Sequence, residues 1–135
     1  MGAAPAVLKL SDHGLQSTAQ TIVAHDDMIA ADPAAVSAIL DATFEGWRRV
    51  LADKPAAAQL VVDSYVPDGS PYEDVAYQTK TLELLAPYVA PTPDAQIGQI
   101  DPARWQAAAQ LMADYGIVEA LPDLDTSLAP GLLTT

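Results

Sequence analysis

The sequence contains no cysteine and only two histidines, and these shortages exclude several kinds of site. Without a thiol the chain has no disulfide, no zinc–thiolate centre and no cysteine nucleophile. His13 and His25 are too few for a histidine-rich metal cage. No G-x-S-x-G or H-E-x-x-H motif pairs a nucleophile or a metal with a base. We therefore expect no enzyme activity, no metal and no cofactor.

Basic residues are also scarce. Six Lys and Arg residues stand against 18 Asp and Glu, so the formal net charge is −12. A chain this acidic repels phosphate backbones and anionic lipid surfaces, and we expect no nucleic-acid partner. The acids are spread along the sequence, which is typical of solvated helix faces and helix caps.

Long apolar runs and aromatic residues are lacking too. Asp, Pro or Lys interrupts every apolar stretch well before the roughly 18 residues that a membrane-spanning helix requires. Only 6% of the residues are aromatic, whereas half are apolar and many of these are Ala. This composition favours helices that pack through small and aliphatic side chains. The length of 135 residues fits one domain.

Aspartate followed by proline marks the predicted helix starts. Asp32-Pro33 predicts a helix to about residue 52, because Asp accepts hydrogen bonds from free N–H groups and Pro fits the first helical position. Asp53-Lys54-Pro55 predicts a second helix, and Asp101-Pro102 predicts another that stops at Gly116. A further helix is expected over residues 72–85, and Asp125 is expected to cap a last short turn.

Apolar residues recur at steps of three and four in these segments, which predicts amphipathic helices. The expected buried face of the first helix consists of Val36, Ile39, Leu40, Thr43, Phe44, Trp47, Val50 and Leu51. Trp47 and Trp105 both lie on such faces, so we interpret them as packing residues and not as solute-stacking residues. Arg48, Arg49 and Arg104 lie off the faces and are interpreted as surface ion-pair partners.

Two segments near the N-terminus predict strands. Residues 5–10 (PAVLKL) and residues 18–25 (TAQTIVAH) are short, and the second has β-branched residues at its centre. Ser11-Asp12-His13-Gly14 between them predicts a turn. The sequence thus predicts an α/β chain that is mostly helical, with one or two strands followed by four or more helices.

Five short pieces occur in an order that resembles one family. They are the strand end and helix start around Asp32-Pro33, the A-x-x-x-G-W-like piece at residues 42–47, the helix start at residues 52–58, Gly98 to Trp105 (resembling G-x-M-D-P-x-x-W), and the closing pieces at residues 116–118 and 123–125. In this order the pieces resemble the C-terminal part of the NMT1/THI5-like solute-binding proteins, which serve importers of nitrate, sulfonates and thiamine precursors.

The resemblance implies a fold and a function. The family has two α/β lobes, the type II periplasmic-binding-protein fold, with solute held in the cleft between them. Residues 1–135 would form a single partial domain corresponding to the C-terminal segment, with much of both lobes absent. The implied function is that of the substrate-binding component, or a fragment of one, of an ABC importer for a small organic or anionic solute. Its implied partners are the solute, an ABC permease, and either the missing N-terminal lobe or a homo-oligomer.

The family is periplasmic or lipoprotein-anchored. The segment before Leu10 has a single Lys and no basic region ahead of an apolar stretch, so we expect no signal peptide and a cytoplasmic location if the chain is expressed as written.

The local candidate for solute contact is the turn Asp12-His13-Gly14, because loops next to a hinge strand often carry binding groups. A plain turn is the alternative at these residues. The alternative for the whole chain is a stand-alone helical module for interaction or oligomerisation, with no transport ligand. In that case helix faces left without a sheet would be exposed and would associate with another surface.

Overall fold

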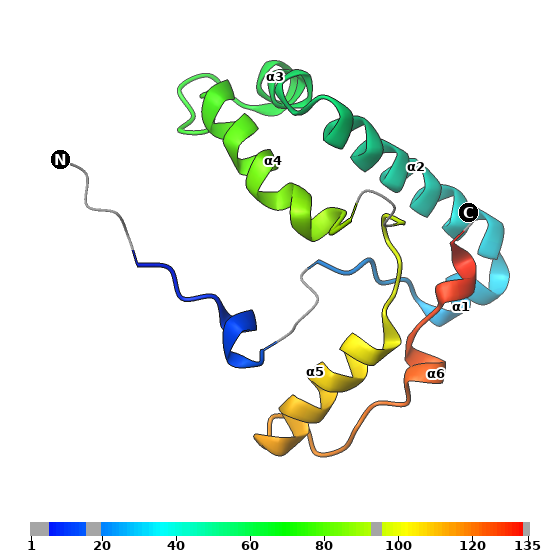
Figure 1. Ribbon diagram of the computed structural model, residues 1–135. Helices are drawn as coiled ribbons and strands as arrows, with labels where there is room; N and C mark the ends of the chain where they lie inside the picture. The colour runs from blue at the N-terminus through cyan, green and yellow to red at the C-terminus, as the bar shows by residue number, and fades with distance from the viewer. Residues whose placement is uncertain (1–5, 16–19, 93–95, 134–135) are drawn as a thin grey trace. The chain divides into compact units, whose positions relative to one another are not determined.

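Helices make up the regular structure of the described part of this chain (Figure 1). The computed structural model describes residues 6–15, 20–92 and 96–133. The elements are η1 (Leu10–His13), α1 (Asp26–Ala31), α2 (Pro33–Ala52), α3 (Lys54–Tyr65), α4 (Val75–Val89), α5 (Pro102–Asp114), α6 (Leu124–Ser127) and η2 (Pro130–Leu132), where η1 and η2 are single 3₁₀ turns. The prediction of a mostly helical chain is confirmed.

The strand predictions are wrong for the residues that the structure describes. Residues 6–9 are irregular and Leu10 begins η1, while residues 20–25 contain a bend and irregular backbone. Residue 5 and residues 18–19 lie outside the described part of the chain. The physical reason is that β-branched residues favour extended backbone, but a strand also needs a paired neighbour. No described segment supplies one.

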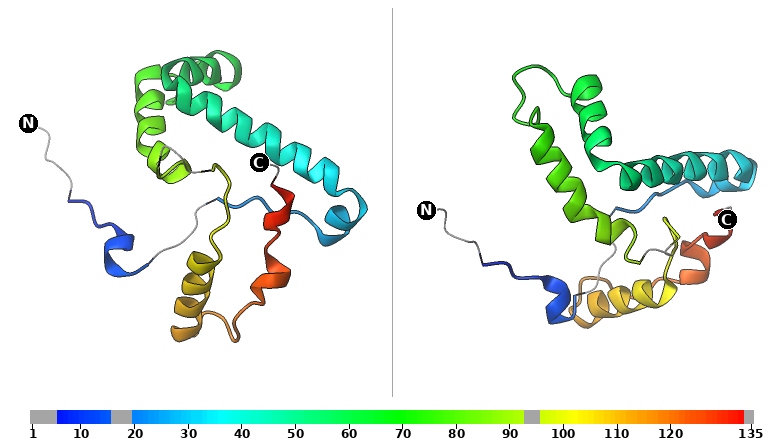
Figure 2. Two further views of the ribbon diagram at one scale, coloured as in Figure 1. Left: turned by 45° about the vertical axis from the view of Figure 1, so that its right-hand side comes forward. Right: turned by 45° about the horizontal axis from the view of Figure 1, so that its top comes forward.

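The chain divides into two units. Unit 1 comprises Met1–His25 with Ile100–Pro130, and unit 2 comprises Asp26–Gln99 with Gly131–Thr135. In unit 1, α5 packs on α6. In unit 2, α1 packs on α2, and the helices α2, α3 and α4 all pack on one another, most extensively α3 on α4 (Figure 2).

An aspartate carboxylate begins each of the helices α2 to α6. Each carboxylate accepts a hydrogen bond from a backbone N–H two or three positions later, at 2.9–3.2 Å. The five capping residues are Asp32, Asp53, Asp74, Asp101 and Asp123. The predicted caps at Asp32, Asp53 and Asp101 are confirmed. The last cap is Asp123, and Asp125 instead donates its N–H to that carboxylate. The prediction of Asp125 as the cap is therefore wrong.

Helix α4 begins and ends later than residues 72–85, the range predicted from the sequence. It begins at Val75 and not at residue 72, because the Asp74 carboxylate caps it by accepting from the Tyr77 N–H at 3.0 Å. It continues past residue 85 to Val89 even though Pro87 has no N–H to donate. The final turn is closed by the Ala90 N–H, which donates to the Ala86 carbonyl at 2.9 Å.

Few side chains are fully buried. Among the described apolar residues only Val36 and Ala58 are buried, with 6% and 1% of their surface exposed. Most of the face predicted on α2 is half-buried, including Trp47, whereas Ile39 is 54% exposed. Trp105 of α5 is also half-buried. The helix limits therefore depend strongly on local capping, because burial contributes in proportion to the apolar area removed from water.

The cap between α2 and α3 gives the first prediction. Asp53→Ala removes the acceptor of the Ala56 N–H and should lower the free energy of unfolding of unit 2 by about 1 kcal/mol. Helix content and unfolding followed by circular dichroism measure the effect. Asp53→Asn keeps an acceptor and should be nearly neutral. Asp68→Ala, in the loop after α3, removes a charge without a cap and should also be nearly neutral; equal losses in all three variants would contradict the prediction.

Candidate functional site

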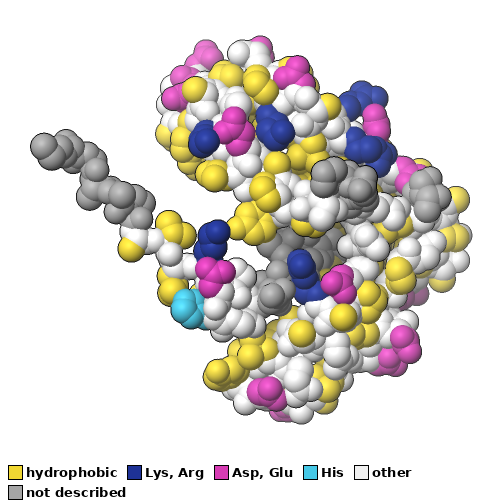
Figure 3. Space-filling view, viewed as in Figure 1, with side chains coloured by type: hydrophobic (Ala, Val, Ile, Leu, Met, Phe, Trp, Pro, Cys, Tyr) yellow, Lys and Arg dark blue, Asp and Glu magenta, His cyan; other side chains and the backbone are white. Residues whose placement is uncertain are grey.

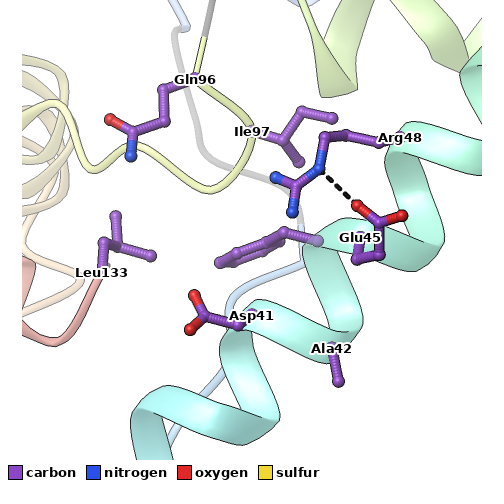
Figure 4. A pocket seen from close by; sticks show the side chains of 8 residues that line it. Asp41, Ala42, Glu45, Arg48, Gln96, Ile97 and Leu133 are labelled. Carbon is purple, nitrogen blue, oxygen red and sulfur yellow. Dashed lines mark hydrogen bonds and ion pairs between the residues drawn. The ribbon is translucent and has the colours of Figure 1, made fainter. Parts of the chain in front are cut away.

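One side of α2 forms the wall of an open hollow in unit 2. Phe44 and Glu45 lie three and four residues after Asp41, and Arg48 lies four and three residues after them, so all four lie on one face of the helix. The hollow has a volume of about 560 Å³. Its other lining residues are Ala42, Gln96, Ile97 and Leu133 (Figure 4).

A turn at residues 96–99 brings the opposite wall close to α2. The Gln99 N–H donates to the Gln96 carbonyl at 3.2 Å, and Gly98 has a φ of +84°. This is the backbone that favours glycine at the third position of a tight turn. A Cβ at Gly98 would overlap the ring of Phe44, so the turn lies against the ring only because residue 98 has no side chain. The contact places Gln96 and Ile97 over the hollow.

Two arginines hold Glu45 at the rim of the hollow. The Arg48 Nε donates to Glu45 Oε2 at 2.9 Å and the Arg49 Nε donates to Glu45 Oε1 at 2.9 Å. The expectation that Arg48 and Arg49 are surface ion-pair partners is confirmed. Hydrogen bonds from Arg48 and then Arg49 lower the pKa of Glu45 below its ordinary value of 4.5, because they stabilise the ionised carboxylate.

The lining has a mixed chemistry. Phe44, Ile97 and Leu133 offer apolar contact, while Gln96 offers an amide that both donates and accepts. The Arg48 guanidinium retains N–H donors beyond the one bound to Glu45, and it could bind an anionic group. Asp41 and Glu45 oppose such a group, since both carboxylates line the same hollow.

The residues predicted for solute contact lie elsewhere. Asp12 and His13 are part of η1 and Gly14 follows it with a φ of +89°, so the predicted turn is confirmed. All three residues are exposed, and none lines the hollow. Within the described residues, η1 packs on none of the other helices. No helix among the described residues packs beside Asp12, His13 and Gly14.

Two further pairs of carboxylates, Asp26 with Asp27 and Asp123 with Asp125, lie at helix starts. Asp26 and Asp27 lie in the first turn of α1, where acids are favoured by the helix dipole. Asp123 caps α6. In the part of the chain that the structure describes, no three His, Asp or Glu side chains gather as possible metal ligands.

Helix α4 is apolar on two sides. Val75, Leu82 and Val89 are half-buried on the side that packs in unit 2. A second row contains Tyr77, Leu84 and Tyr88, at 58%, 64% and 79% exposure, and its spacing of seven and four residues aligns it along the helix. We call these three residues the α4 row. Hydrophobic side chains appear over α4 in the space-filling view, with basic and acidic side chains beside them (Figure 3).

The sequence interpretation missed both features. From spacing alone, the apolar face of this helix would consist of Val75, Leu82 and Leu85, but Leu85 is 43% exposed. The regular spacings at residues 41–48 and 77–88 are visible in the sequence. Which of two faces packs inside depends on contacts with other helices, and sequence spacing does not supply these.

Comparisons with known protein families, with curated proteins and with solved structures gave no match. None of the described helices has the combination of length and apolarity needed to cross a membrane.

The Gly98 turn gives the second prediction. Gly98→Ala should destabilise unit 2 by about 1–3 kcal/mol, because alanine disfavours a positive φ and its methyl group overlaps the Phe44 ring. Chemical denaturation measures the loss. Adding Phe44→Leu should recover part of it by making room for the methyl group. Gly69→Ala, at a φ of +80° with open space around it, isolates the backbone contribution. An identical loss in Gly98→Ala and Gly69→Ala would contradict the ring contact.

The Glu45 ion pairs give the third prediction. In the double variant Arg48→Gln/Arg49→Gln, the pKa of Glu45 should rise toward 4.5, as measured by carboxyl NMR titration. Because the native pKa is lowered, the ion pairs stabilise the fold above pH 4.5 and this contribution disappears as the pH falls through the native pKa. Arg104→Gln in α5 should leave the Glu45 titration unchanged; an unchanged titration in the double variant would refute the assignment.

Proposed function

We propose that this chain is a helical protein-interaction module and that it has no transport ligand of its own. The observation that carries the proposal is the second apolar side of α4. Tyr77, Leu84 and Tyr88 form an exposed row while the other side of the same helix packs in unit 2. Tyrosines and a leucine spaced along one helix are the anchors with which amphipathic helices bind protein grooves.

The α4 row is largely exposed, whereas the opposite side of the helix packs in unit 2. Exposing tyrosine and leucine side chains to water costs solvation free energy, although single exposed apolar residues are common on protein surfaces. Leu84 and Tyr88 are neighbours one turn apart, and Tyr77 lies on the same face two turns before Leu84. Apolar side chains aligned on one exposed face are typical of binding sites. Few fully buried side chains in the described residues also suit a module that gains stability when a partner covers it.

The second candidate is the C-terminal segment of an ABC importer's solute-binding component, of the NMT1/THI5-like class. Two observations favour it. The predicted helix starts at Asp32 and Asp101 are formed, and Phe44 and Gly98, from two of the resembling pieces, lie in contact. The hollow would then be a remnant site for an anionic solute beside Arg48. Against it stands the lack of strands in the described residues, since the family's lobes are built on sheets.

A binding and melting experiment separates the two candidates and gives the fourth prediction. The purified chain should bind the neutral apolar dye Nile red, and Leu84→Gln/Tyr88→Gln should bind less of it because the exposed row is lost. Ile39→Gln/Leu60→Gln is the matched control, since Ile39 and Leu60 are exposed residues outside the row. An alkanesulfonate, nitrate and an aminopyrimidine should leave the melting temperature unchanged.

The opposite results favour the importer. A rise in the melting temperature with one of these solutes, abolished by Arg48→Gln, would show ligand binding in the hollow. Dye binding that is equal in both double variants would show that the α4 row is not the exposed binding surface, and the interaction proposal would fail.

A further inference from the structure

Charge selects the kind of partner that fits the α4 row. By sequence, unit 2 holds twelve acidic and four basic residues, a formal net charge of −8. The four cations are all engaged within the unit. Arg48 and Arg49 bind Glu45, Lys80 binds Glu83 at 2.8 Å, and Lys54 donates to the Leu51 carbonyl at 3.0 Å. The unit therefore offers a partner a surplus of carboxylates and few available cations.

The ion pair on α4 itself follows the same pattern. Lys80 is the only cation of α4, and it forms an ion pair with Glu83, three residues further along the helix. This hydrogen bond raises the pKa of Lys80 and lowers that of Glu83. At neutral pH the pair is close to neutral toward a partner, so the acidic field around the α4 row comes from the rest of unit 2.

This field disfavours two other occupants. A second copy of the chain would bring another −12 charge to the interface, and like charges oppose association. An anionic lipid surface is repelled for the same reason. A surface with the opposite charge gains both steering during encounter and discrimination against other partners.

We propose that the α4 row binds a protein surface on which apolar residues are flanked by Lys and Arg. This inference rests on the proposed interaction function. Tyr77, Leu84 and Tyr88 supply the apolar contact, and the surplus carboxylates of unit 2 supply the attraction to the basic flanks. Affinity comes mainly from the row, while the charge sets the choice of partner and the rate of association.

The test uses the full chain and three synthetic amphipathic helices that share one leucine face. Their polar faces carry Lys, Gln or Glu. Isothermal titration calorimetry should give the tightest binding for the Lys peptide, weaker binding for the Gln peptide and the weakest for the Glu peptide. Added salt should weaken binding of the Lys peptide and leave the Gln peptide unaffected.

Two double variants locate the contact. Leu84→Gln/Tyr88→Gln should weaken binding of the Lys peptide about tenfold or more, since a few buried anchor residues, tyrosine prominent among them, carry most of the binding free energy at such interfaces. Ile39→Gln/Leu60→Gln keeps the same net charge and should bind as the parent chain does. Gln is a good helix former, so α4 should keep its helix content, which circular dichroism checks.

Each other outcome overturns the inference in a recognisable way. Equal binding of the three peptides would refute the charge selection, and equal losses in the two double variants would refute the location. A dimer of the parent chain in sedimentation, lost in Leu84→Gln/Tyr88→Gln, would make a second copy the occupant. Binding of anionic vesicles through the row would make lipid the occupant. Nile red binding that is equal in Leu84→Gln/Tyr88→Gln and Ile39→Gln/Leu60→Gln would instead refute the interaction function itself.

Discussion

An aspartate carboxylate that accepts backbone N–H groups determines where most of this chain's helices begin. The first N–H groups of a helix have no partner inside it, and a side-chain acceptor supplies one. Asp32, Asp53, Asp74, Asp101 and Asp123 all do so. At three of these starts a proline occupies one of the first two helical positions, where its missing N–H costs nothing. The helix boundaries are thus set within a few residues of sequence.

Local capping also explains how a chain with so few buried side chains has regular structure. Each cap contributes on the order of 1 kcal/mol, comparable to burying a CH₂ group or two. The same aspartates contribute to the surplus of negative charge. One residue type therefore has two consequences. It fixes the helix starts, and it adds to a negative charge that repels other acidic surfaces.

Local contacts within a helix can be predicted from the sequence, whereas contacts between distant segments cannot. Helices at residues 33–52, 54–65 and 102–114 follow from caps and spacing, and they were predictable. The segment at residues 20–25 has strand-forming residues, but a strand needs a neighbouring strand from elsewhere in the chain, and this segment is irregular. The hollow depends on the contact between Phe44 and Gly98, and the α4 row depends on which side of α4 packs inside. Neither can be read from the spacing of residues in one helix.

The contact between Phe44 and Gly98 has a consequence for the order of folding. Helices α2 to α4 can form and pack through contacts between neighbours along the chain, and such contacts form quickly. The turn at residues 96–99 must instead come back to α2 over a long stretch of chain, and closing that loop costs conformational entropy. Contact with the Phe44 ring can offset this cost only after α2 has placed the ring. The turn should therefore dock last during folding and release first during unfolding. The hollow beside the turn would then be lost while α2, α3 and α4 remain packed. A molecule bound in the hollow would therefore report on docking of the turn, and not on formation of the helices.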